Sequence, residues 1–438
     1  MDIDGGSCTR SSGAAAYSSA TACASATEAA NEAHDGDRVY YASGAYEDQI
    51  IADRCYGDWV TFAPAPNAKV SIDGTDGGTG PDAWDLDGGS GSVCHVRIQG
   101  FDLTDRVYVE HAANYVDIVG NHIHSKVPPS RNTTWAQLAG NGVNFNTKGK
   151  PAGIHNVTIR SNRIENIGYV CRGVGSDPNA CDTDDNSPSW GYCIYDLDTS
   201  ELTVTGNRID GCWEDAIQVH AATFVFAGND VSNIENGASG HQDGIQIFAA
   251  TPRTGAVIER NNFHGAVDTC LRIQDNDRYR FVIRNNVCAG TINSGLDLEH
   301  LHDSTISFNT VGKSRYGSNL SGQASDAGAE PSNDVIEDNI FMPASNGCGW
   351  TLVGTRHTYR YNLLPEACST GGCTPGCSSN APRFLHATNG ADMRLTSGSA
   401  GVNAGVNERG ATRDVGGRPR PPGSVSDIGA WERQARDP

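Results

Sequence analysis

Five segments of the chain place a small residue before an apolar, a polar and a second apolar residue. Period-2 alternation is typical of a β-strand, and it points the apolar residues inward and the polar residues outward. The outward residues form two predicted columns. The first column comprises Asn144, Gln218, Gln246, Arg272 and Asp297, and the second comprises Asn146, His220, Phe248, Gln274 and Glu299. Tyr195, in a segment of poorer register, is placed with the first column.

The residue types in these columns indicate binding rather than simple solvation. They are mainly amides, with one arginine, one histidine and two acids, and they include no lysine. A face that is only solvated would favour Thr, Ser, Lys and Glu. Parallel strands stack ~4.8 Å apart, so residues on adjacent strands can contact one group of a ligand. The pattern favours a ligand-binding groove, with a solvated face as the alternative.

Two titratable residues stand at the start of the third segment. His241 and Asp243 could be an acid/base pair or a metal pair at the rim of the groove, and Asp215 holds the matching position in another segment. The identity of any metal is unknown at this point. The alternative is that Asp215 and Asp243 accept hydrogen bonds from backbone amides where the chain turns into the strand. His300 should point inward by alternation, which favours a core or turn role.

A short repeated phrase indicates the scaffold for these columns. A β-prone stretch is followed by a small or polar residue, an asparagine and then an apolar residue, with tightest spacings of 22 to 24 residues. Such a period holds two or three short strands but not a strand and a long helix, which predicts stacked coils of parallel strands. The repeated asparagines are Asn121, Asn162, Asn207, Asn229, Asn262, Asn286, Asn309 and Asn339.

Both ends of the chain strengthen this interpretation. Residues 36–46 and 414–432 resemble the entry strand and the closing segment of secreted proteins of the pectate-lyase-like superfamily. The resemblance implies an all-β fold, a single right-handed parallel β-helix. We expect about 8–10 coils, an N-terminal cap helix and a Cys-rich C-terminal segment.

The expected domain boundaries follow the same reasoning. Residues 1–34 are an N-terminal arm and cap helix, and residues 35–345 are the β-helix. Residues 346–438 are Cys-rich loops and a C-terminal capping tail. Inserts in the β-helix are expected at 126–140, 168–190 and 313–334.

Composition excludes some classes of partner. The net charge of -20 argues against nucleic acid, because phosphate binding needs a basic face. No apolar stretch reaches 18 residues, so no membrane-spanning helix is expected. The acidic first residues lack the apolar core of a signal peptide, and we expect the leader to be missing from this sequence.

Cysteine usage predicts a secreted, disulfide-bonded protein. There are 14 cysteines, and disulfides persist in oxidising compartments. For the group near the C-terminus, structural zinc is the alternative. The predicted pairs are Cys8 with Cys23, Cys55 with Cys94, Cys171 with Cys181, Cys193 with Cys212, and Cys270 with Cys288, and the C-terminal group is Cys348, Cys368, Cys373 and Cys377.

The resemblance implies an extracellular enzyme that cleaves a polysaccharide, and three hypotheses remain open. The first is a lyase that acts by β-elimination on a uronic-acid polysaccharide. It needs groups that neutralise the substrate carboxylate, a base for the C5 proton and an acid for the leaving oxygen. The neutralising candidates are Asn144, Gln218, Gln246, Arg272 or a calcium ion; the base candidates are His220, His241 and Arg272; the acid candidates are Tyr195 or a histidine.

The second hypothesis is a glycoside hydrolase for a neutral or weakly charged glycan. It needs two carboxyl groups, for which Asp297 and Glu299 are the candidates, with Asp243 from a neighbouring coil. The third is a C5-epimerase or a carbohydrate-binding protein without catalysis. In that case Phe248 and Tyr195 would stack on sugar rings, and Gln274 would contact the same ligand.

Overall fold

The structure is a computed structural model. It describes residues 1–2, 4–11, 17–74, 82–125, 141–149, 153–168, 191–197, 199–234, 242–248, 253–322, 328–346, 349–365, 373, 375–386, 392–408, 410–421, 423–434 and 437. The chain divides into two compact units. The first is Met1–Ala222 with Asn236–Gly240, and the second is Thr223–Glu235 with His241–Pro438.

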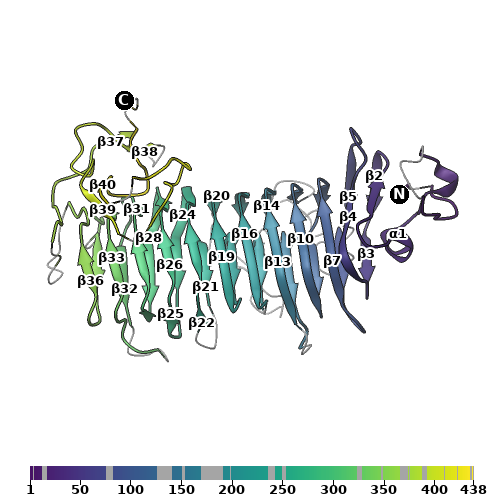
Figure 1. Cartoon of the computed structure of the whole chain (residues 1–438), viewed down its shortest axis with the longest axis horizontal. Helices are drawn as coiled ribbons and strands as arrows, with labels where there is room; N and C mark the ends of the chain where they lie inside the picture. Colours follow the sequence, from purple (N-terminus) through teal and green to yellow (C-terminus); the bar gives the residue numbers. More distant parts are fainter. Residues whose placement is uncertain are drawn as a thin grey trace, which may run out of the picture. The chain divides into compact units, whose positions relative to one another are not determined.

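Each unit is a parallel β-helix (Figure 1). The chain passes through three short strands per coil, and each strand pairs in parallel with its equivalent in the next coil. The strands therefore form three rows, which we call the first, second and third row in the order in which the chain visits them. This confirms the fold class expected from the repeated phrase.

The first unit contains α1 (Ala26–Glu32), a 3-10 turn η1 (Ser19–Thr21) and β1 to β18. Its first row is β1 (Arg38–Tyr41), β4 (Cys55–Pro64), β7 (Val93–Gln99), β10 (Ala113–Val119), β13 (Ile154–Arg160) and β16 (Glu201–Thr205). Its second row is β2 (Gly44–Glu47), β5 (Val70–Asp73), β8 (Asp102–Thr104), β11 (His122–His124), β14 (Arg163–Ile167) and β17 (Arg208–Cys212). Its third row is β3 (Gln49–Ala52), β6 (Trp84–Asp87), β9 (Val107–Glu110), β12 (Val143–Asn146), β15 (Ile194–Asp196) and β18 (Ile217–Val219).

The second unit repeats the arrangement, except that β24 bends from the second row into the third. Its first row is β19 (Thr223–Ala227), β23 (Val257–Glu259), β26 (Val282–Arg284), β30 (Thr305–Ser307), β33 (Val335–Glu337) and β36 (Thr358–Arg360). Its second row is β20 (Asp230–Ile234), β24 (Asn262–Ile273), β27 (Val287–Cys288), β31 (Thr310–Val311) and β34 (Ile340–Phe341). Its third row is β21 (Asp243–Ile247), the end of β24, β28 (Thr291–Glu299), β32 (Gly317–Ser321) and β35 (Trp350–Leu352). The smaller strands are β22 (Arg253–Thr254), β25 (Arg278–Tyr279), β29 (Leu301–His302), β37 (Phe384–His386), β38 (Asp392–Leu395), β39 (Gly405–Asn407) and β40 (Gly423–Ser426).

Stacked aliphatic side chains form the core. In the first row of the first unit, Ile98, Ile118 and Ile159 are in register and fully buried. Burying such a side chain contributes about 1.5–3 kcal/mol. Because the register repeats from coil to coil, the outward residues between these aliphatic positions are in register as well.

A ladder of buried asparagines fixes the turn between the first and second rows. The Asn162 side chain donates to the Ile118 carbonyl at 2.9 Å and accepts from the Asn121 amide at 2.9 Å. The ladder members are Asn121, Asn162 and Asn207 in the first unit, and Asn229, Asn261, Asn286, Asn309, Asn339 and Asn362 in the second. Asn261 is the member rather than Asn262, because the apolar Phe263 follows Asn261 by the same two positions as in other coils. The first row of each unit has six strands. In the first unit, the coils of β1, β4 and β7 lack the asparagine, so the repeated phrase did not reveal them.

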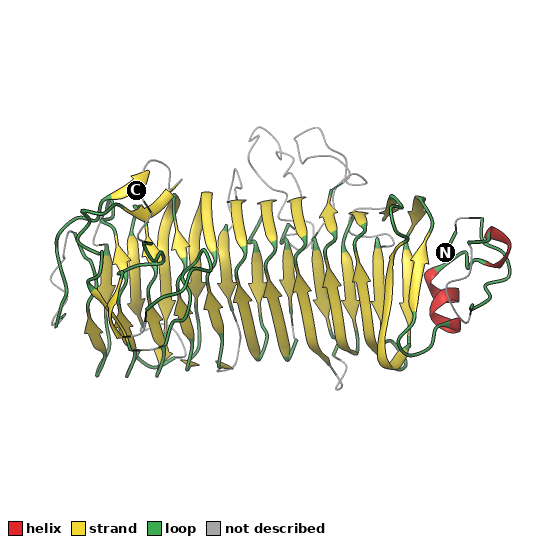
Figure 2. Ribbon diagram, turned by 45° about the horizontal axis from the view of Figure 1, so that its top comes forward, coloured by secondary structure: helices red, strands yellow, loops and turns green. Residues whose placement is uncertain are grey.

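Helix α1 lies against the first coil, as the fold prediction expected (Figure 2). The Ser25 hydroxyl caps it by accepting from the Glu28 amide at 3.2 Å, which satisfies one of the free N–H groups of the first turn. Its alanine face is buried, and the Tyr56 hydroxyl donates to the Ala30 carbonyl at 2.8 Å. The helix thereby covers a sheet edge that would otherwise be open.

Four predicted disulfides are confirmed: Cys8–Cys23, Cys55–Cys94, Cys193–Cys212 and Cys270–Cys288. Cys373 also pairs with Cys377, so these two are disulfide-bonded rather than zinc ligands. Cys171, Cys181, Cys348 and Cys368 lie outside the described residues. No helix in the described part of the chain is long and apolar enough to cross a membrane.

The C-terminal segment of the second unit packs on its second row. Met393 and Ala430 are buried against Val287, and Ile428 is buried against Ile340. The buried Arg420 guanidinium donates to Glu432 and to Asn285 at 2.9 Å each. This segment therefore covers the second row, and the third row of the unit carries the outward polar column.

Candidate functional site

The third row of the second unit holds a polar column in the register that the sequence pattern predicted. Gln246 on β21 is paired with Arg272 on β24, and Arg272 is paired with Asp297 on β28. Asn319 on β32 continues the column and was missed, because it lies in an insert expected at 313–334. The functional roles of these residues remain predictions.

Arg272 lies between two carboxylates. Its Nη1 is 3.9 Å from Asp243 Oδ2, and its Nε is 3.9 Å from Asp297 Oδ2. The Arg272 and Asp297 side chains are each 21% exposed, whereas Asp243 is fully buried. A ligand can therefore reach the guanidinium and one of the two carboxylates.

The environment of Asp243 favours its protonated form. Burial raises the pKa of Asp243 to about 8; Arg272 opposes the rise, and Asp268 and Asp297 add to it. Asp268 accepts a hydrogen bond from Asn293 at 3.1 Å. At neutral pH the protonated form of Asp243 is therefore favoured, beside the Arg272 guanidinium and the Asp297 carboxyl group.

The third row of the first unit holds a second polar column, which contains three predicted residues and two that were missed. Asn144 is paired with Tyr108 and Tyr195, and Tyr195 is paired with Gln218. Asp85 on β6 precedes Tyr108 in the same register. Tyr108 and Asp85 were missed because the asparagine phrase does not reach their coils.

Burial changes the protonation of this column. Burial, followed by the nearby Glu110, Asp82 and Asp87, raises the pKa of Asp85 to about 7. Burial also raises the pKa of Tyr195, with a smaller contribution from Asp196. The Tyr195 ring stacks on Tyr192 at a centroid distance of 4.7 Å. The column thus presents protonated phenols, which can donate hydrogen bonds and stack on sugar rings.

A lysine and a histidine that were not predicted lie beside this column, in turns rather than in strands. Lys148, in the turn after β12, forms an ion pair with Glu110 on β9, and its ammonium lies 5.4 Å from the centre of the Tyr108 ring. His111 Nδ1 is 2.6 Å from Asp87 Oδ1. Turn residues fall outside the period-2 pattern, so alternation alone could not place them.

The remaining predicted residues differ in their exposure. Asn146 on β12, Gln274 and His220 are partly exposed, and the His220 amide donates to Asp196 at 3.1 Å. Phe248 is 43% exposed at the end of β21. His241 lies outside the described residues.

Glu299 differs from its expected environment, whereas the inward position of His300 is confirmed. Glu299 was placed in an outward column but is only 3% exposed. Asp215 is also buried. His300 is buried, as its inward position predicted. In the described residues, the close groups of potential metal ligands contain neither Asp215 nor Asp243.

Comparison with known proteins supports the fold. A pectate lyase, Pel9A, matches with a TM-score of 0.52 and 15% identity over 99% of this chain and 96% of its own. A PL6 alginate lyase in complex with a trisaccharide matches with a TM-score of 0.41 and 14% identity, over 84% and 87% of the two chains. PfbA, a surface adhesin of Streptococcus pneumoniae, matches with a TM-score of 0.42 and 12% identity, over 82% and 91%. No protein-family model and no curated protein matches the sequence.

Fold and comparison together define a parallel β-helix protein, similar in fold to the pectate lyase Pel9A. The resemblance noted from the two ends of the chain is confirmed at the level of the fold. The fold is one that polysaccharide lyases use.

Proposed function

We propose that the protein is an extracellular polysaccharide lyase that cleaves a uronic-acid polysaccharide by β-elimination on the third row of its second unit. The observation that carries the proposal is the accessible Arg272 between Asp243 and Asp297. Its neighbour in the column, Gln246, is only 7% exposed and supplies an amide on a fold that a pectate lyase uses. The disulfides support an oxidising, extracellular location.

Arginine suits the first requirement of the reaction. A planar guanidinium binds a carboxylate through two parallel hydrogen bonds. Binding the uronate carboxylate withdraws charge from it, which makes the adjacent C5 proton more acidic. In the proposal Arg272 therefore binds the substrate carboxylate, and a different group acts as the base.

Protonation of Asp243 allows Arg272 to bind a substrate carboxylate although the protein as a whole is acidic. With Asp243 neutral, the formal charges of Asp243, Arg272 and Asp297 sum to zero. With Asp243 ionised they sum to -1, which would repel an anionic substrate. Because burial raises the pKa of Asp243 to about 8, the neutral arrangement prevails at and below neutral pH.

The elimination breaks two bonds, C5–H and C4–O, and transfers two protons: the C5 proton goes to a base, and the leaving oxygen receives a proton from solvent water. A base takes the C5 proton, the C5–H electron pair forms the C4–C5 double bond, and the C4–O bond breaks toward the leaving sugar. The leaving oxygen then takes a proton. Asp297 is suited to receive the C5 proton, since it is accessible and 3.9 Å from the same guanidinium; His241 remains a predicted base.

Calcium is the other group that could neutralise the carboxylate. It takes about 6–8 oxygen ligands. At this column the Arg272 guanidinium already stands between the carboxylates and would repel a cation. The residues here do not fit calcium, so no step of the proposed reaction passes through it.

A glycoside hydrolase is the second candidate. It needs a carboxylic acid and a carboxylate, and the raised pKa of Asp243 beside Asp297 favours such a pair. The protonated Asp243 would be the acid and Asp297 the base. It ranks second because Asp243 is fully buried and Glu299, the other predicted carboxyl group, is 3% exposed.

The experiment is a substrate panel. The purified chain is incubated with polygalacturonate, alginate and a neutral glucan, with and without a chelator and with added calcium. A lyase generates the ultraviolet absorbance of an unsaturated uronide on an acidic polymer. A flat trace on every acidic polymer contradicts the proposal, and new reducing ends without that absorbance indicate the hydrolase. Loss of activity only with the chelator would indicate a metal requirement outside the Arg272 column.

A further inference from the structure

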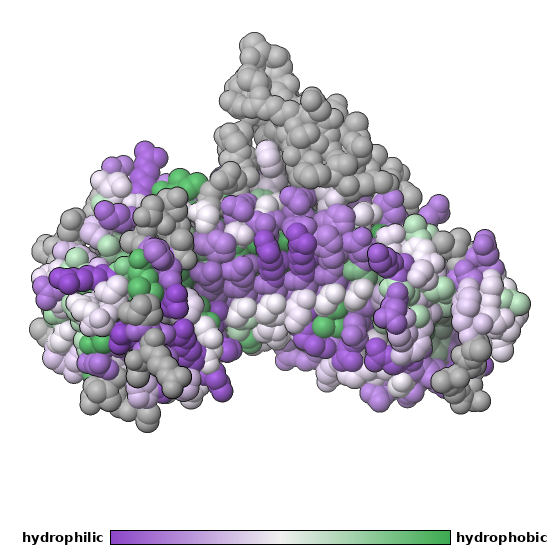
Figure 3. Space-filling model, turned by 90° about the horizontal axis from the view of Figure 1, so that it is seen from above, coloured by the Kyte–Doolittle hydropathy of each residue, from purple (hydrophilic) through white to green (hydrophobic). Residues whose placement is uncertain are grey.

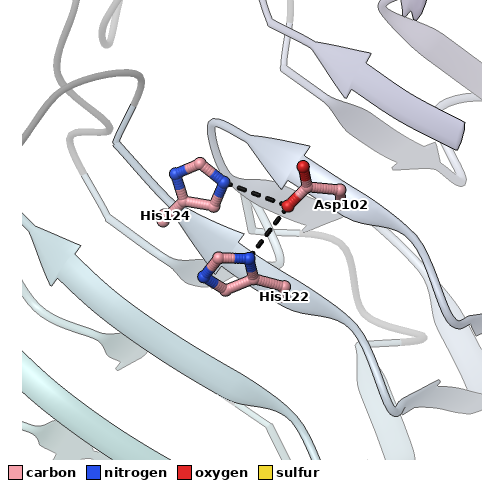
Figure 4. Close-up of side chains that lie close together, drawn as sticks. All are labelled: Asp102, His122 and His124. Carbon is pink, nitrogen blue, oxygen red and sulfur yellow. Dashed lines mark hydrogen bonds and ion pairs between the residues drawn. The ribbon is translucent and has the colours of Figure 1, made fainter. Parts of the chain in front are cut away.

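A cluster of one aspartate and two histidines lies on the second row of the first unit, away from the third-row column (Figure 4). Asp102 is on β8, and His122 and His124 are alternate residues of the next strand, β11. Asp102 Oδ1 is 2.9 Å from His122 Nδ1 and 3.1 Å from His124 Nε2. Their three ligand atoms all lie within 4.8 Å of one another.

In each ring the inner nitrogen faces Asp102 and the outer nitrogen faces away from it. Both outer nitrogens already have a hydrogen-bond acceptor. His124 Nδ1 is 2.7 Å from the Ser125 carbonyl oxygen, and His122 Nε2 is 2.8 Å from Glu165 Oε1. A carbonyl and a carboxylate oxygen only accept, so each outer nitrogen carries the hydrogen. In a neutral ring the inner nitrogen then has a lone pair. Both lone pairs point toward the Asp102 oxygen (Figure 4).

Three acceptor atoms that converge in this way repel one another unless protons or a metal cation lie between them. Either each ring takes a second proton, or a cation binds the two nitrogens and the carboxylate. A cation satisfies all three converging acceptor atoms at once, and these atoms lie within 4.8 Å of one another. We propose that Asp102, His122 and His124 form a binding site for a divalent transition metal of the zinc type.

The donor set and its spacing fit zinc. Zinc binds nitrogen and oxygen ligands at about 2.0–2.2 Å in tetrahedral geometry, which places neighbouring ligand atoms roughly 3.3–3.6 Å apart. The two inner distances of 2.9 and 3.1 Å need only a small opening. Calcium is disfavoured because it prefers an all-oxygen shell with more ligands.

The surroundings also match a metal site. Histidine ligands in metalloproteins usually donate their second N–H to a carboxylate or a carbonyl, as Glu165 and Ser125 accept here. Glu165 is held in turn by Arg163, whose Nε donates to it at 2.7 Å. Asp102 is exposed and both histidines are partly exposed, so water can complete the coordination. Hydrophilic side chains predominate in the middle of the face that Figure 3 shows.

The site would join three coils of the β-helix. Asp102, the histidine strand and Glu165 lie on the consecutive strands β8, β11 and β14. A metal that binds the folded chain stabilises it by mass action. The inference does not depend on the lyase proposal, since the site lies on a different row.

The test uses the full chain, stripped with a chelator and dialysed, and titrated with zinc sulfate by calorimetry at neutral and at acid pH. We expect one saturable site of micromolar or tighter affinity, weakened by more than tenfold at acid pH, and a higher melting temperature with zinc. Calcium chloride should give neither effect. The variants His124→Gln and Asp102→Asn should abolish binding, and Glu165→Gln should weaken it by about 10–100-fold.

Two controls distinguish the site from others. His111→Gln alters the Asp87, Glu110 and His111 group, the second cluster of potential ligands, and should leave zinc binding unchanged. Circular dichroism of the zinc-free variants checks that they fold. No saturable zinc binding, binding that survives His124→Gln in a folded chain, or binding that is lost only with His111→Gln would each overturn the proposal.

Discussion

At the scale of single residues, the accessible guanidinium of Arg272 carries the proposed chemistry. Arg272→Gln removes the positive charge that binds the uronate carboxylate, so kcat/KM on the cleaved polymer should fall by about 10²–10³, a loss typical of one electrostatic group. Arg272→Lys keeps the charge without the planar fork and should recover part of the activity. Initial rates from ultraviolet absorbance measure both variants.

A matched control is available for Arg272. Arg284 on the first row donates to Glu259 at 2.7 Å and is also partly exposed in an ion pair. Arg284→Gln should leave kcat/KM unchanged. Equal losses in the two variants would show that the loss comes from stability rather than from the site.

The buried Asp243 predicts a characteristic pH dependence. Its carboxyl is neutral below a pKa of about 8 and charged above it, so substrate binding should weaken as pH rises through that value. Stability should also fall with rising pH, between the unfolded pKa of ~3.9 and the folded value, because the folded chain binds the extra proton.

Asp243→Asn imitates the protonated carboxyl at every pH. This variant should flatten the alkaline rise in KM, and it should remove up to a few kcal/mol of the pH-dependent loss of stability. Urea denaturation from about pH 4 to pH 9, and KM across neutral and alkaline pH, test this. If KM of Asp243→Asn still rises at alkaline pH as in the unaltered protein, the rise comes from another group.

At the scale of elements, the asparagine ladder holds the coils in register. The Asn309 side chain is buried, donates to the Ile283 carbonyl and to Asn339 at 2.9 Å each, and accepts from the Asn286 amide at 3.0 Å. Asn309→Ala leaves buried backbone groups without these partners, which costs about 1–3 kcal/mol each. We expect a loss of about 2–5 kcal/mol in the free energy of unfolding, measured with urea.

The exposed Asn346 provides the comparison, and Asn346→Ala should be close to neutral. A similar small effect at Asn309 would mean that the ladder does not determine stability.

The elements also show what the sequence could predict. Alternation and the asparagine phrase predicted the stacked strands and the register of Gln246, Arg272 and Asp297, because both depend on local periodicity. They did not predict Asn319, Tyr108 or Lys148. Asn319 lies where the polar sequence resembles an insert, Tyr108 lies in coils without the phrase, and Lys148 lies in a turn. Glu299, expected in an outward column, is only 3% exposed, and alternation within one strand could not predict this burial.

At the scale of the whole molecule, the net charge of -20 opposes the approach of a polyanion. Salt screens such long-range repulsion over about 10 Å at 0.1 M ionic strength. KM for an acidic polysaccharide should therefore decrease as salt rises from low to moderate concentration, until screening of the Arg272 contact reverses the trend. Initial rates over a salt series measure this, and a KM that rises from the lowest salt onward would contradict it.

The most direct test of the central claim is the origin of the oxygen atoms in the product. The acidic polymer that the chain cleaves is digested in water enriched in the heavy oxygen isotope, and the fresh products are analysed by mass spectrometry. β-Elimination predicts an unsaturated end, lighter than a hydrolysis product by one water, with no heavy oxygen introduced at cleavage. Saturated products that have gained one heavy oxygen per cleavage would show hydrolysis and contradict the lyase mechanism.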